Sequence, residues 1–251
     1  MTELPRAFLD RPIAHRALHD TGAGRPENSR AAIRAAIAGG YGIEIDLQLS
    51  SDGVAMVFHD DELDRLTGAR GPISARSAEE LAATPLRHGD EGIPTLAEVL
   101  ELVDGRAPLQ IELKDQTGRL GPETGTLEDA TAAALSGYHG PVALMSFNPH
   151  SVAALASRLP DLPRGLTTCG FDALHWPQLD ETTRAHLRAI SDAGRTGACF
   201  ISHQWRELDH PRVTELQDAG LAVLCWTVRS AEEEAQARQI ARNVTFEGYA
   251  A

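Results

Sequence analysis

Residues 12–49 read PIAHRALHDTGAGRPENSRAAIRAAIAGGYGIEIDLQL, and this stretch decides the fold class. It opens with a short apolar run that ends at His15, continues with an Ala-rich segment over 27–40, and closes with GIEIDLQL over 42–49. Short apolar runs bounded by turn residues are typical of strands, whereas a longer run with apolar residues at helical spacing is typical of a helix. The stretch therefore predicts a strand, a helix and a second strand, the repeating unit of parallel α/β proteins.

The same alternation continues to the end of the chain. Strands are expected at VAMVFHD, PLQIELK, PVALMSF, RGLTTC, GACFIS, LAVLCWTV and NVTFEG, mostly with helices between them. About eight core strands separated by helices favour a single closed (β/α)8 barrel of the TIM type, with a doubly wound open sheet as the alternative. No Gly- or Ser-rich linker and no internal repeat divides the chain, so residues 1–251 are expected to form a single domain.

One connection is longer than a barrel normally needs. The region 61–107, which follows His59, contains Gly, Pro and short helical patterns such as SAEELAA and TLAEVLELV. Connections between elements of compact domains usually span only a few residues. We therefore expect 61–107 to be a small insertion, part of which overhangs the mouth of the barrel.

Composition narrows the possible partners and locations. The formal net charge of −13 argues against a nucleic-acid partner, because proteins that bind nucleic acids usually present a basic surface to the phosphates. The sequence has neither a run of about 18 apolar residues nor a signal-type N-terminus, so neither stable membrane insertion nor export is expected. Cys169, Cys199 and Cys225 are widely spaced in apolar surroundings, which argues against disulfides or a zinc cluster and favours a cytoplasmic location.

Two carboxylates share one face of the strand expected over 42–49. Glu44 and Asp46 are two residues apart, so their side chains point to the same side of a strand. Like charges placed together in a barrel interior need a cation, a proton or hydrogen bonds to offset their repulsion. Carboxylate oxygens suit calcium, magnesium or manganese better than zinc. The pair therefore indicates a metal site, and a solvated strand face is the alternative.

A hairpin is expected to bring His59 to these carboxylates. Asp52-Gly53 between two alternating runs is a strong signal for a two-residue turn, and this turn sets the register of the two strands. The resulting pairs are Asp46 with His59, Leu47 with Phe58, and Leu49 with Met56. If the turn also uses Ser51, the register slips by one residue.

Two further strand ends carry polar pairs. Glu112 and Lys114 lie two residues apart in LQIELKD. Glu112 would add a third metal ligand and Lys114 a cation, and the alternative is that the two form a plain ion pair. His15 and Arg16 close the first strand. Imidazole exchanges protons near neutral pH, and the guanidinium group of arginine can donate hydrogen bonds to two phosphate oxygens at once. Because the C-terminal ends of barrel strands form the functional face, these residues are expected near the carboxylates.

The order and spacing of these motifs resemble the glycerophosphodiester phosphodiesterase family. Its members show His-Arg-Gly, Pro-Glu-Asn-Thr/Ser, Glu-x-Asp, an Asp-Gly turn, His-Asp and Glu-x-Lys. The matching residues here are His15-Arg16-Ala17, Pro26-Glu27-Asn28-Ser29, Glu44-Ile45-Asp46, Asp52-Gly53, His59-Asp60 and Glu112-Leu113-Lys114. Ser146-Phe147 and Trp226-Thr227-Val228 are similar to later strand-end motifs of the family, so the resemblance covers nearly the whole chain.

The resemblance implies a barrel with an irregular β-hairpin, and a metal-dependent enzyme that hydrolyses glycerophosphodiesters to an alcohol and glycerol 3-phosphate. The cofactor implied is a divalent metal ion, calcium or magnesium, and the partner is a small-molecule glycerophosphodiester. The residues implied are Glu44, Asp46 and Glu112 as metal ligands, His15 and His59 as catalytic proton carriers, Arg16 and Lys114 as phosphate contacts, and Trp226 as an apolar wall for the alcohol.

Two residues depart from the family pattern. Ala17 stands where the family usually has glycine, so a backbone with positive φ would be strained there, whereas an extended backbone would accept alanine. Glu247, in the run NVTFEG, stands where many members have aspartate. Neither change removes a predicted metal ligand or proton carrier.

Two other functions are compatible with the same residues. Phospholipase D type hydrolysis of lysophospholipids would use the same phosphate site with a larger mouth, and the lack of an evident membrane anchor or basic amphipathic helix disfavours it. A catalytically silent phosphodiester-binding module is the second alternative, because a fold does not guarantee activity. The sequence leaves the head group of the substrate and the oligomeric state open.

Overall fold

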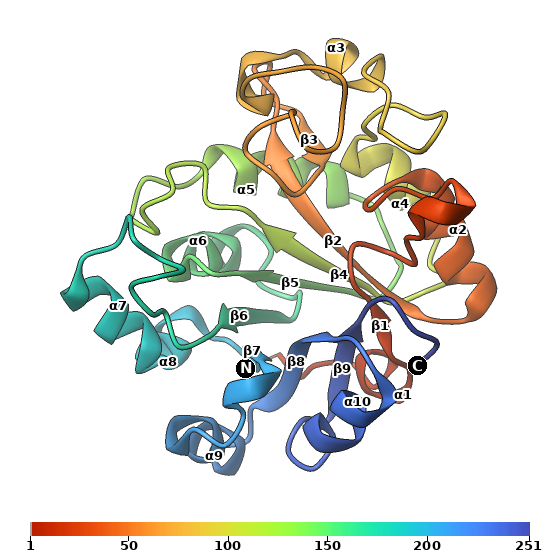
Figure 1. Ribbon diagram of the computed structural model, residues 1–251. Coiled ribbons are helices and arrows are strands. Elements are labelled where there is room, and N and C mark those ends of the chain that lie inside the picture. The colour runs from red at the N-terminus through yellow and green to blue at the C-terminus, as the bar shows by residue number, and fades with distance from the viewer. Residues whose placement is uncertain (1) are drawn as a thin grey trace.

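The computed structural model describes residues 2–251, in which eight parallel strands close into a barrel (Figure 1). The barrel strands are β1 (Ile13–Ala14), β2 (Gly42–Leu49), β4 (Leu109–Leu113), β5 (Val142–Ser146), β6 (Arg164–Thr168), β7 (Phe200–Gln204), β8 (Ala222–Val228) and β9 (Asn243–Phe246). Closure comes from β1, which pairs in parallel with both β2 and β9. Because this pairing leaves no open edge between the first and last strands, the predicted TIM-type barrel is confirmed and the doubly wound open sheet is excluded.

Helices occupy the connections and surround the barrel (Figure 1). They are α2 (Arg30–Gly39), α4 (Leu96–Val103), α5 (Thr126–Leu135), α6 (Pro149–Arg158), α7 (Glu181–Arg188), α8 (Ala193–Thr196), α9 (Pro211–Asp218) and α10 (Ala231–Ala237), with 3-10 turns at Thr21–Ala23, Ile73–Ala75 and Trp205–Glu207. Side chains such as those of Ser29 and Thr95 accept a hydrogen bond from the first turn and so fix where α2 and α4 begin. Among residues 2–251, none of the helices combines the length and apolar character needed to cross a membrane.

Apolar side chains pack on both sides of the strands. Outward-facing residues such as Ile43, Ile45 and Ile111 are fully buried in a large cluster between the barrel and the helices. Inside the barrel, a smaller cluster joins the first residues of β1 and β7, Ile13 and Phe200, to Phe8 of the N-terminal helix α1 (Ala7–Asp10). This cluster fills the end at which the strands begin, so the opposite end is available for polar side chains.

The hairpin after β2 differs in register from the prediction. Strand β3 (Ala55–Val57) runs antiparallel to the end of β2, and the observed pairs are Leu47 with Val57, Gln48 with Met56, and Leu49 with Ala55. The predicted register, with Asp46 opposite His59, is therefore wrong by one residue. The turn is closed by Ser50, whose N–H donates to the carbonyl of Val54 and whose hydroxyl accepts from the N–H of Val54, so Ser51 belongs to the turn.

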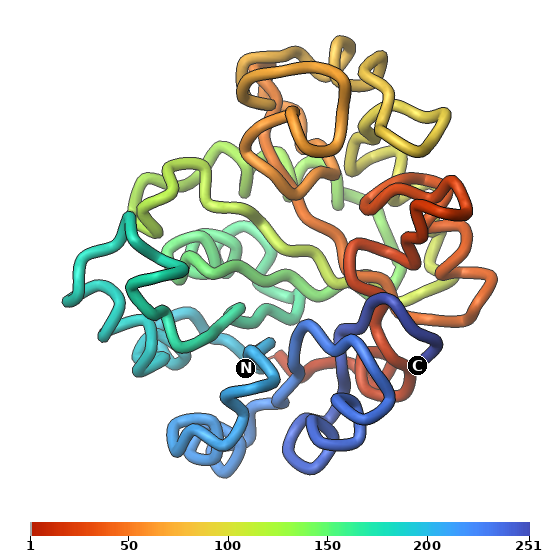
Figure 2. The backbone as a smooth tube through the Cα atoms, in the orientation of Figure 1, coloured from red at the N-terminus to blue at the C-terminus, as the bar shows by residue number. Residues whose placement is uncertain are grey.

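The chain between β3 and α4 folds into a lobe beside the barrel. Figure 2 shows this lobe as the orange and yellow part of the tube, set apart from the rest. It contains α3 (Ala78–Ala82) and a separate apolar cluster that includes Phe58, Leu63 and Leu81. Helix α4, in contrast, packs against α2 and α5 in the outer ring. The region 61–107 therefore combines the lobe with one helix of the barrel.

Candidate active site

The C-terminal ends of the strands surround a pocket of about 160 Å³, here called the inner pocket. Its lining includes all eight side chains predicted from the sequence, namely His15, Arg16, Glu44, Asp46, His59, Glu112, Lys114 and Trp226. These residues come from β1, β2, β4, β8 and the end of the hairpin, which are far apart in the sequence. The fold thus brings the predicted residues together at one place.

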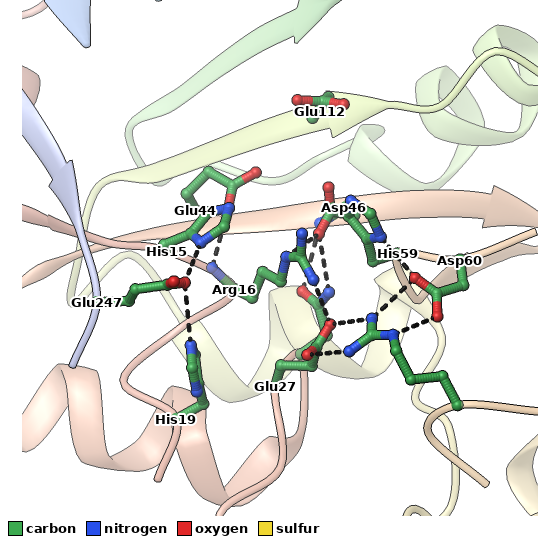
Figure 3. Close-up of polar contacts among 12 residues, drawn as sticks. His15, Arg16, His19, Glu27, Glu44, Asp46, His59, Asp60, Glu112 and Glu247 are labelled. Atoms are coloured by element: carbon green, nitrogen blue, oxygen red, sulfur yellow. Dashed lines mark hydrogen bonds and ion pairs between the residues drawn. The ribbon is translucent and has the colours of Figure 1, made fainter. Parts of the chain in front are cut away.

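Three carboxylates meet in this pocket. Glu44 and Asp46 project from the same face of β2, and Asp46 lies beside Glu112 in the register of β2 with β4. Oxygen atoms of the three groups lie within 4.8 Å of one another, and none of the residues is more than 5% exposed. Figure 3 shows Glu112 on the strand next to the one that carries Glu44 and Asp46. A solvated strand face is therefore excluded.

Two cations partly offset the charge of the carboxylates. The Nζ atom of Lys114 lies 2.9 Å from Asp46 Oδ1 and 2.6 Å from Glu112 Oε1, and the Nε atom of Arg16 lies 3.6 Å from Asp46 Oδ2. Burial alone would raise the pKa of Asp46, but Lys114, His59 and Arg16 together hold it well below its ordinary value. Asp46 is therefore ionised at neutral pH.

Glu44 has the opposite balance. Burial and repulsion from Asp46 and Glu112 raise the pKa of Glu44 well above its ordinary value, although the N–H of Arg16 donates to its carboxylate at 2.9 Å. A divalent ion among the three carboxylates would remove this repulsion and favour all three in their ionised form. Because the donors are all oxygen atoms, the set fits calcium, magnesium or manganese.

The loop after β1 orients Glu44 through its backbone. Arg16 and Ala17 both lie in the left-handed region, with φ of 52° and 64°. This turn aims the N–H of Arg16 at the Glu44 carboxylate and the N–H of Ala17 at the Glu44 carbonyl, each at 2.9 Å. Ala17 therefore has the strained backbone with positive φ, not the extended backbone that alanine accepts easily. This conformation costs about 1–2 kcal/mol relative to glycine.

Asn28 orients Asp46, a contact that the sequence did not reveal. Its side-chain N–H donates to Asp46 Oδ2 at 3.0 Å, and its side-chain oxygen accepts from the backbone N–H of Asp46 at 3.3 Å. The neighbouring Ser29 caps α2 instead. Asn28 itself therefore belongs to the site and not to the helix cap.

His15 is held by Glu247, whose role the sequence also did not reveal. The Nδ1 atom of His15 lies 2.6 Å from Glu247 Oε2, and Nε2 of His19 lies 3.6 Å from the same oxygen (Figure 3). Arg229 approaches the other oxygen of this carboxylate at 2.8 Å. Burial lowers the pKa of His15, and the bond to Glu247 opposes this only in part. Because a carboxylate only accepts hydrogen bonds, the proton resides on Nδ1, and Nε2 is the ring nitrogen available for chemistry.

His59 is held in the same way by its neighbour Asp60. The Nδ1 atom of His59 lies 2.7 Å from Asp60 Oδ1. Arg65 then joins Asp60 to Glu27, and Glu27 accepts a 2.6 Å hydrogen bond from Arg16 (Figure 3). This chain of ion pairs ties the lobe to the loop that follows β1. It fixes His59 beside Asp46 even though the hairpin register differs from the predicted one.

Comparison with known proteins identifies the family. Residues 15–245 match the model of the glycerophosphoryl diester phosphodiesterase family. The chain belongs to this family. The glycerophosphodiester phosphodiesterase of Bacillus altitudinis is 33% identical over 164 residues, which are 61% of this chain and 65% of that protein. That of Caldanaerobacter subterraneus is 35% identical over 156 residues, 58% of this chain and 63% of that protein, so the matches span less than two thirds of both relatives.

The fold of this glycerophosphoryl diester phosphodiesterase family member is also similar to solved structures. An Oleispira antarctica phosphodiesterase in complex with the product sn-glycerol-3-phosphate matches with a TM-score of 0.78 and 24% identity. The match covers 96% of this chain and 94% of that chain. The likeness therefore extends over the barrel and the lobe together.

In this family member Trp226 stands between the inner pocket and a larger one. Its indole N–H donates to the carbonyl of Ser202 at 2.9 Å, and its ring meets Phe147 edge-on at 5.5 Å. The larger pocket, of about 660 Å³ and here called the outer pocket, shares Phe147, Trp226 and Lys114 with the inner one. The two pockets are therefore adjacent, with aromatic rings where they meet.

Proposed function

We propose that this chain hydrolyses glycerophosphodiesters to an alcohol and glycerol 3-phosphate, using a divalent ion, calcium or magnesium. The observation that carries the proposal is the inner pocket, in which three buried carboxylates, two cations and two carboxylate-held histidines face one another. Membership of the family supports the reaction, and the all-oxygen donor set supports the ion.

The cations would bind the phosphate of the substrate. The ion, held by Glu44, Asp46 and Glu112, would supply positive charge to the non-bridging phosphate oxygens. Arg16 and Lys114 line the same pocket, and in the described part of the chain the buried Nε of Arg16 has no hydrogen-bond partner. Their fixed positive charges would stabilise the negative charge that develops on phosphorus-bound oxygens in the transition state.

The histidines would move protons through their Nε2 atoms. One removes a proton from the nucleophile, either water or a hydroxyl of the substrate's own glycerol, and the other protonates the departing alcohol. His59 lines both pockets, whereas His15 lines the inner one. We assign His59 to the leaving alcohol and His15 to the nucleophile, because an alcohol that departs toward the outer pocket passes His59.

Two observations disfavour the alternative functions. A silent binding module would have no use for two histidines that are each held by a carboxylate with Nε2 available. Lysophospholipids carry a long acyl chain on their glycerol, and the inner pocket, which would hold the glycerol half of the substrate, has a volume of only about 160 Å³. Glycerophosphodiesters without acyl chains fit this pocket better.

The proposal is tested by incubating the purified protein with several glycerophosphodiesters and lysolipids, with added magnesium or calcium and with excess chelator. We expect release of glycerol 3-phosphate and free alcohol from the glycerophosphodiesters, and loss of the reaction in chelator. A full rate in chelator, with no metal bound, would contradict the role of the ion. Absence of glycerol 3-phosphate with every ion would contradict the reaction.

A further inference from the structure

The outer pocket has two features that cleavage of a phosphodiester bond does not require by itself. It is lined by three aromatic rings, Phe147, Trp176 and Trp226, and by carboxylates that lie outside the acid triad. It also borders His59 and Lys114, which line the inner pocket. A group attached to phosphate in the inner pocket would therefore extend into a space with aromatic and acidic walls.

The rings form a partial cage around Phe147. The ring centroid of Phe147 lies 5.2 Å from that of Trp176 and 5.5 Å from that of Trp226, with interplanar angles of 51° and 84°. All three residues are half-buried, so each ring is packed on one side and accessible on another. Aromatic faces held at different angles around one space attract ammonium groups, because the π face of each ring is negative.

Of the outer-pocket carboxylates outside the acid triad, Asp60 is paired with Arg65, whereas Asp61 and Asp115 are held by uncharged donors. Asp61 accepts a hydrogen bond from the Gln48 amide at 2.8 Å, and Asp115 accepts from the Asn148 amide at 2.7 Å. These donors do not cancel the negative charge of the carboxylates. Lys114, a cation on the same wall, is already bound to Asp46 and Glu112. With Glu62 on the exposed rim, the outer pocket has a negative field.

The inner pocket offers a different surface to the other half of a substrate. The hydroxyls of Thr167, Ser202 and Thr245 line the inner pocket, are buried, and make no hydrogen bond with any of residues 2–251. Such groups suit a ligand rich in hydroxyls, as glycerol is. The polar and the aromatic walls thus favour one orientation, with glycerol inward and the leaving alcohol outward.

On the basis of the proposed function, we propose that the outer pocket receives the leaving alcohol and selects alcohols that carry a quaternary or primary ammonium group. A neutral alcohol of the same shape keeps its apolar contacts with the rings but loses the attraction of the rings and carboxylates for positive charge. An anionic alcohol is repelled by Asp61, Glu62 and Asp115. Charge, rather than size alone, therefore sets the preference.

The sharpest test compares two substrates that differ in one atom. Glycerophosphocholine carries a quaternary nitrogen, and the 3,3-dimethylbutyl ester of glycerol phosphate has carbon in its place. We expect kcat/KM to be about twofold to thirtyfold higher for the choline ester, the range spanned by cation–π attraction. Equal values of kcat/KM for the two esters would overturn the inference.

Variants of Trp176 separate selection from catalysis, because Trp176 lines the outer pocket and the inner pocket is lined by other residues. Trp176→Ala should remove most of the preference for the choline ester, and Trp176→Phe should retain most of it. Turnover of the neutral 3,3-dimethylbutyl ester should fall by a smaller factor than turnover of the choline ester in Trp176→Ala, because the neutral ester loses only apolar contact with this ring. A preference that survives Trp176→Ala would contradict the aromatic part of the site.

Variants of the carboxylates test the electrostatic part. Glu62→Gln and Asp61→Asn should each lower the preference for the choline ester over its neutral counterpart, because each change removes one negative charge from the outer pocket. Glu101→Gln, on the exposed face of α4, is the matched control because it removes the same charge away from the pocket. An equal effect of the control would show that overall charge, and not the outer pocket, sets the preference.

Direct binding separates this inference from the proposed function. Choline and 3,3-dimethylbutanol are titrated into the wild-type protein and into Trp176→Ala, with no hydrolysis involved. Choline binding that depends on Trp176 supports the outer pocket even if no glycerophosphodiester is hydrolysed, a result that would refute only the reaction. Hydrolysis of all esters at equal rates, without choline binding, would refute only the selection of a cationic alcohol.

Discussion

Glu247 and Asp60 show how single residues organise the site. Each carboxylate holds the Nδ1 atom of one histidine, at 2.6 Å for His15 and 2.7 Å for His59. The ring orientation and the position of the proton are thereby fixed in both cases. The two histidines consequently present the same ring nitrogen, Nε2, to the reaction.

Loss of either histidine should therefore stop turnover without unfolding the protein. Assistance by a general acid or base typically contributes about 100-fold to 10,000-fold, so His15→Ala and His59→Ala should each lower kcat by a factor in this range. His175→Ala is the matched control, because His175 is exposed and pairs with the nearby Asp172, away from the inner pocket. The melting temperatures of the three variants show whether they fold. Turnover close to that of the wild type in both His15→Ala and His59→Ala would contradict the catalytic role of the two histidines.

His203 predicts a pH dependence of stability that is separate from catalysis. It is 3% exposed on β7, its Nδ1 lies 2.8 Å from the hydroxyl of Thr168, and burial lowers its pKa to about 4. The unfolded chain binds a proton at His203 below about pH 6.5, whereas the folded protein does so only below about 4. The free energy of unfolding should therefore fall as the pH drops from 6.5 toward 4, by up to about 3 kcal/mol from this residue.

The variant His203→Gln isolates this contribution, because glutamine does not titrate. Urea unfolding of the wild type and the variant at pH 7, 5.5 and 4.5 gives the two pH profiles. We expect the variant to lose less stability than the wild type over this range. Parallel profiles would show that His203 takes up its proton equally in the folded and unfolded states.

The periodicity of a strand was enough to predict that Glu44 and Asp46 lie together. The residues that orient the site, Glu247 and Asn28, could be recognised only from the folded structure. Glu44 and Asp46 are two residues apart, so a strand places them together whatever the rest of the chain does. Glu247 meets His15 across 232 positions in the sequence, and Asn28 meets Asp46 through a backbone in the left-handed region. Contacts of this kind depend on barrel closure and on loop geometry, which local pattern does not encode.

At the scale of elements, the hairpin shows what a local signal can and cannot decide. Asp52-Gly53 located the turn between β2 and β3, but not the number of residues in it. The hydroxyl and backbone of Ser50 close the turn onto Val54, so the loop takes in Ser51 and the register moves by one residue. The strand expected over 42–49 was predicted closely, as β2 over Gly42–Leu49, because turn residues bound its alternating run on both sides.

The backbone of Gly53 in this turn allows a test of backbone strain. Gly53 has a φ of 82°, and a methyl group added there would meet no atom within 4 Å. Gly53→Ala should therefore destabilise the protein by about 1–2 kcal/mol through its backbone alone. Gly68→Ala is the matched control, since Gly68 has equal space and no positive φ, and it should change stability by less than about 0.5 kcal/mol. Equal effects of the two changes in urea unfolding would count against the hairpin geometry.

At the scale of the whole molecule, the barrel gathers residues from its first strand to its last around one pocket. His15 lies at the end of β1 and Glu247 directly after β9, and these two strands pair to close the barrel. Closure therefore builds the site as well as the fold. It also concentrates negative charge at the acid triad, so the proposed divalent ion would stabilise the folded protein by binding there.

Binding of the ion should raise the melting temperature. An ion at about 100 times its Kd adds about 2.7 kcal/mol to the free energy of unfolding, which corresponds to about 5–10 °C for a chain of this size. Glu44→Gln should lose most of this increase. In chelator, however, the variant should melt no lower than the wild type, because removing one of three buried like charges relieves repulsion. A normal metal-dependent increase in Glu44→Gln would contradict the predicted ligand set.

We propose that the inner pocket cleaves glycerophosphodiesters through its two histidines. The most direct test is the rate of glycerol 3-phosphate release from glycerophosphoglycerol, with magnesium or calcium present, by the wild type and by a folded His15→Ala/His59→Ala double variant. We predict steady release by the wild type and a rate at least about 100-fold lower in the double variant. Release at a similar rate by both proteins would contradict the claim.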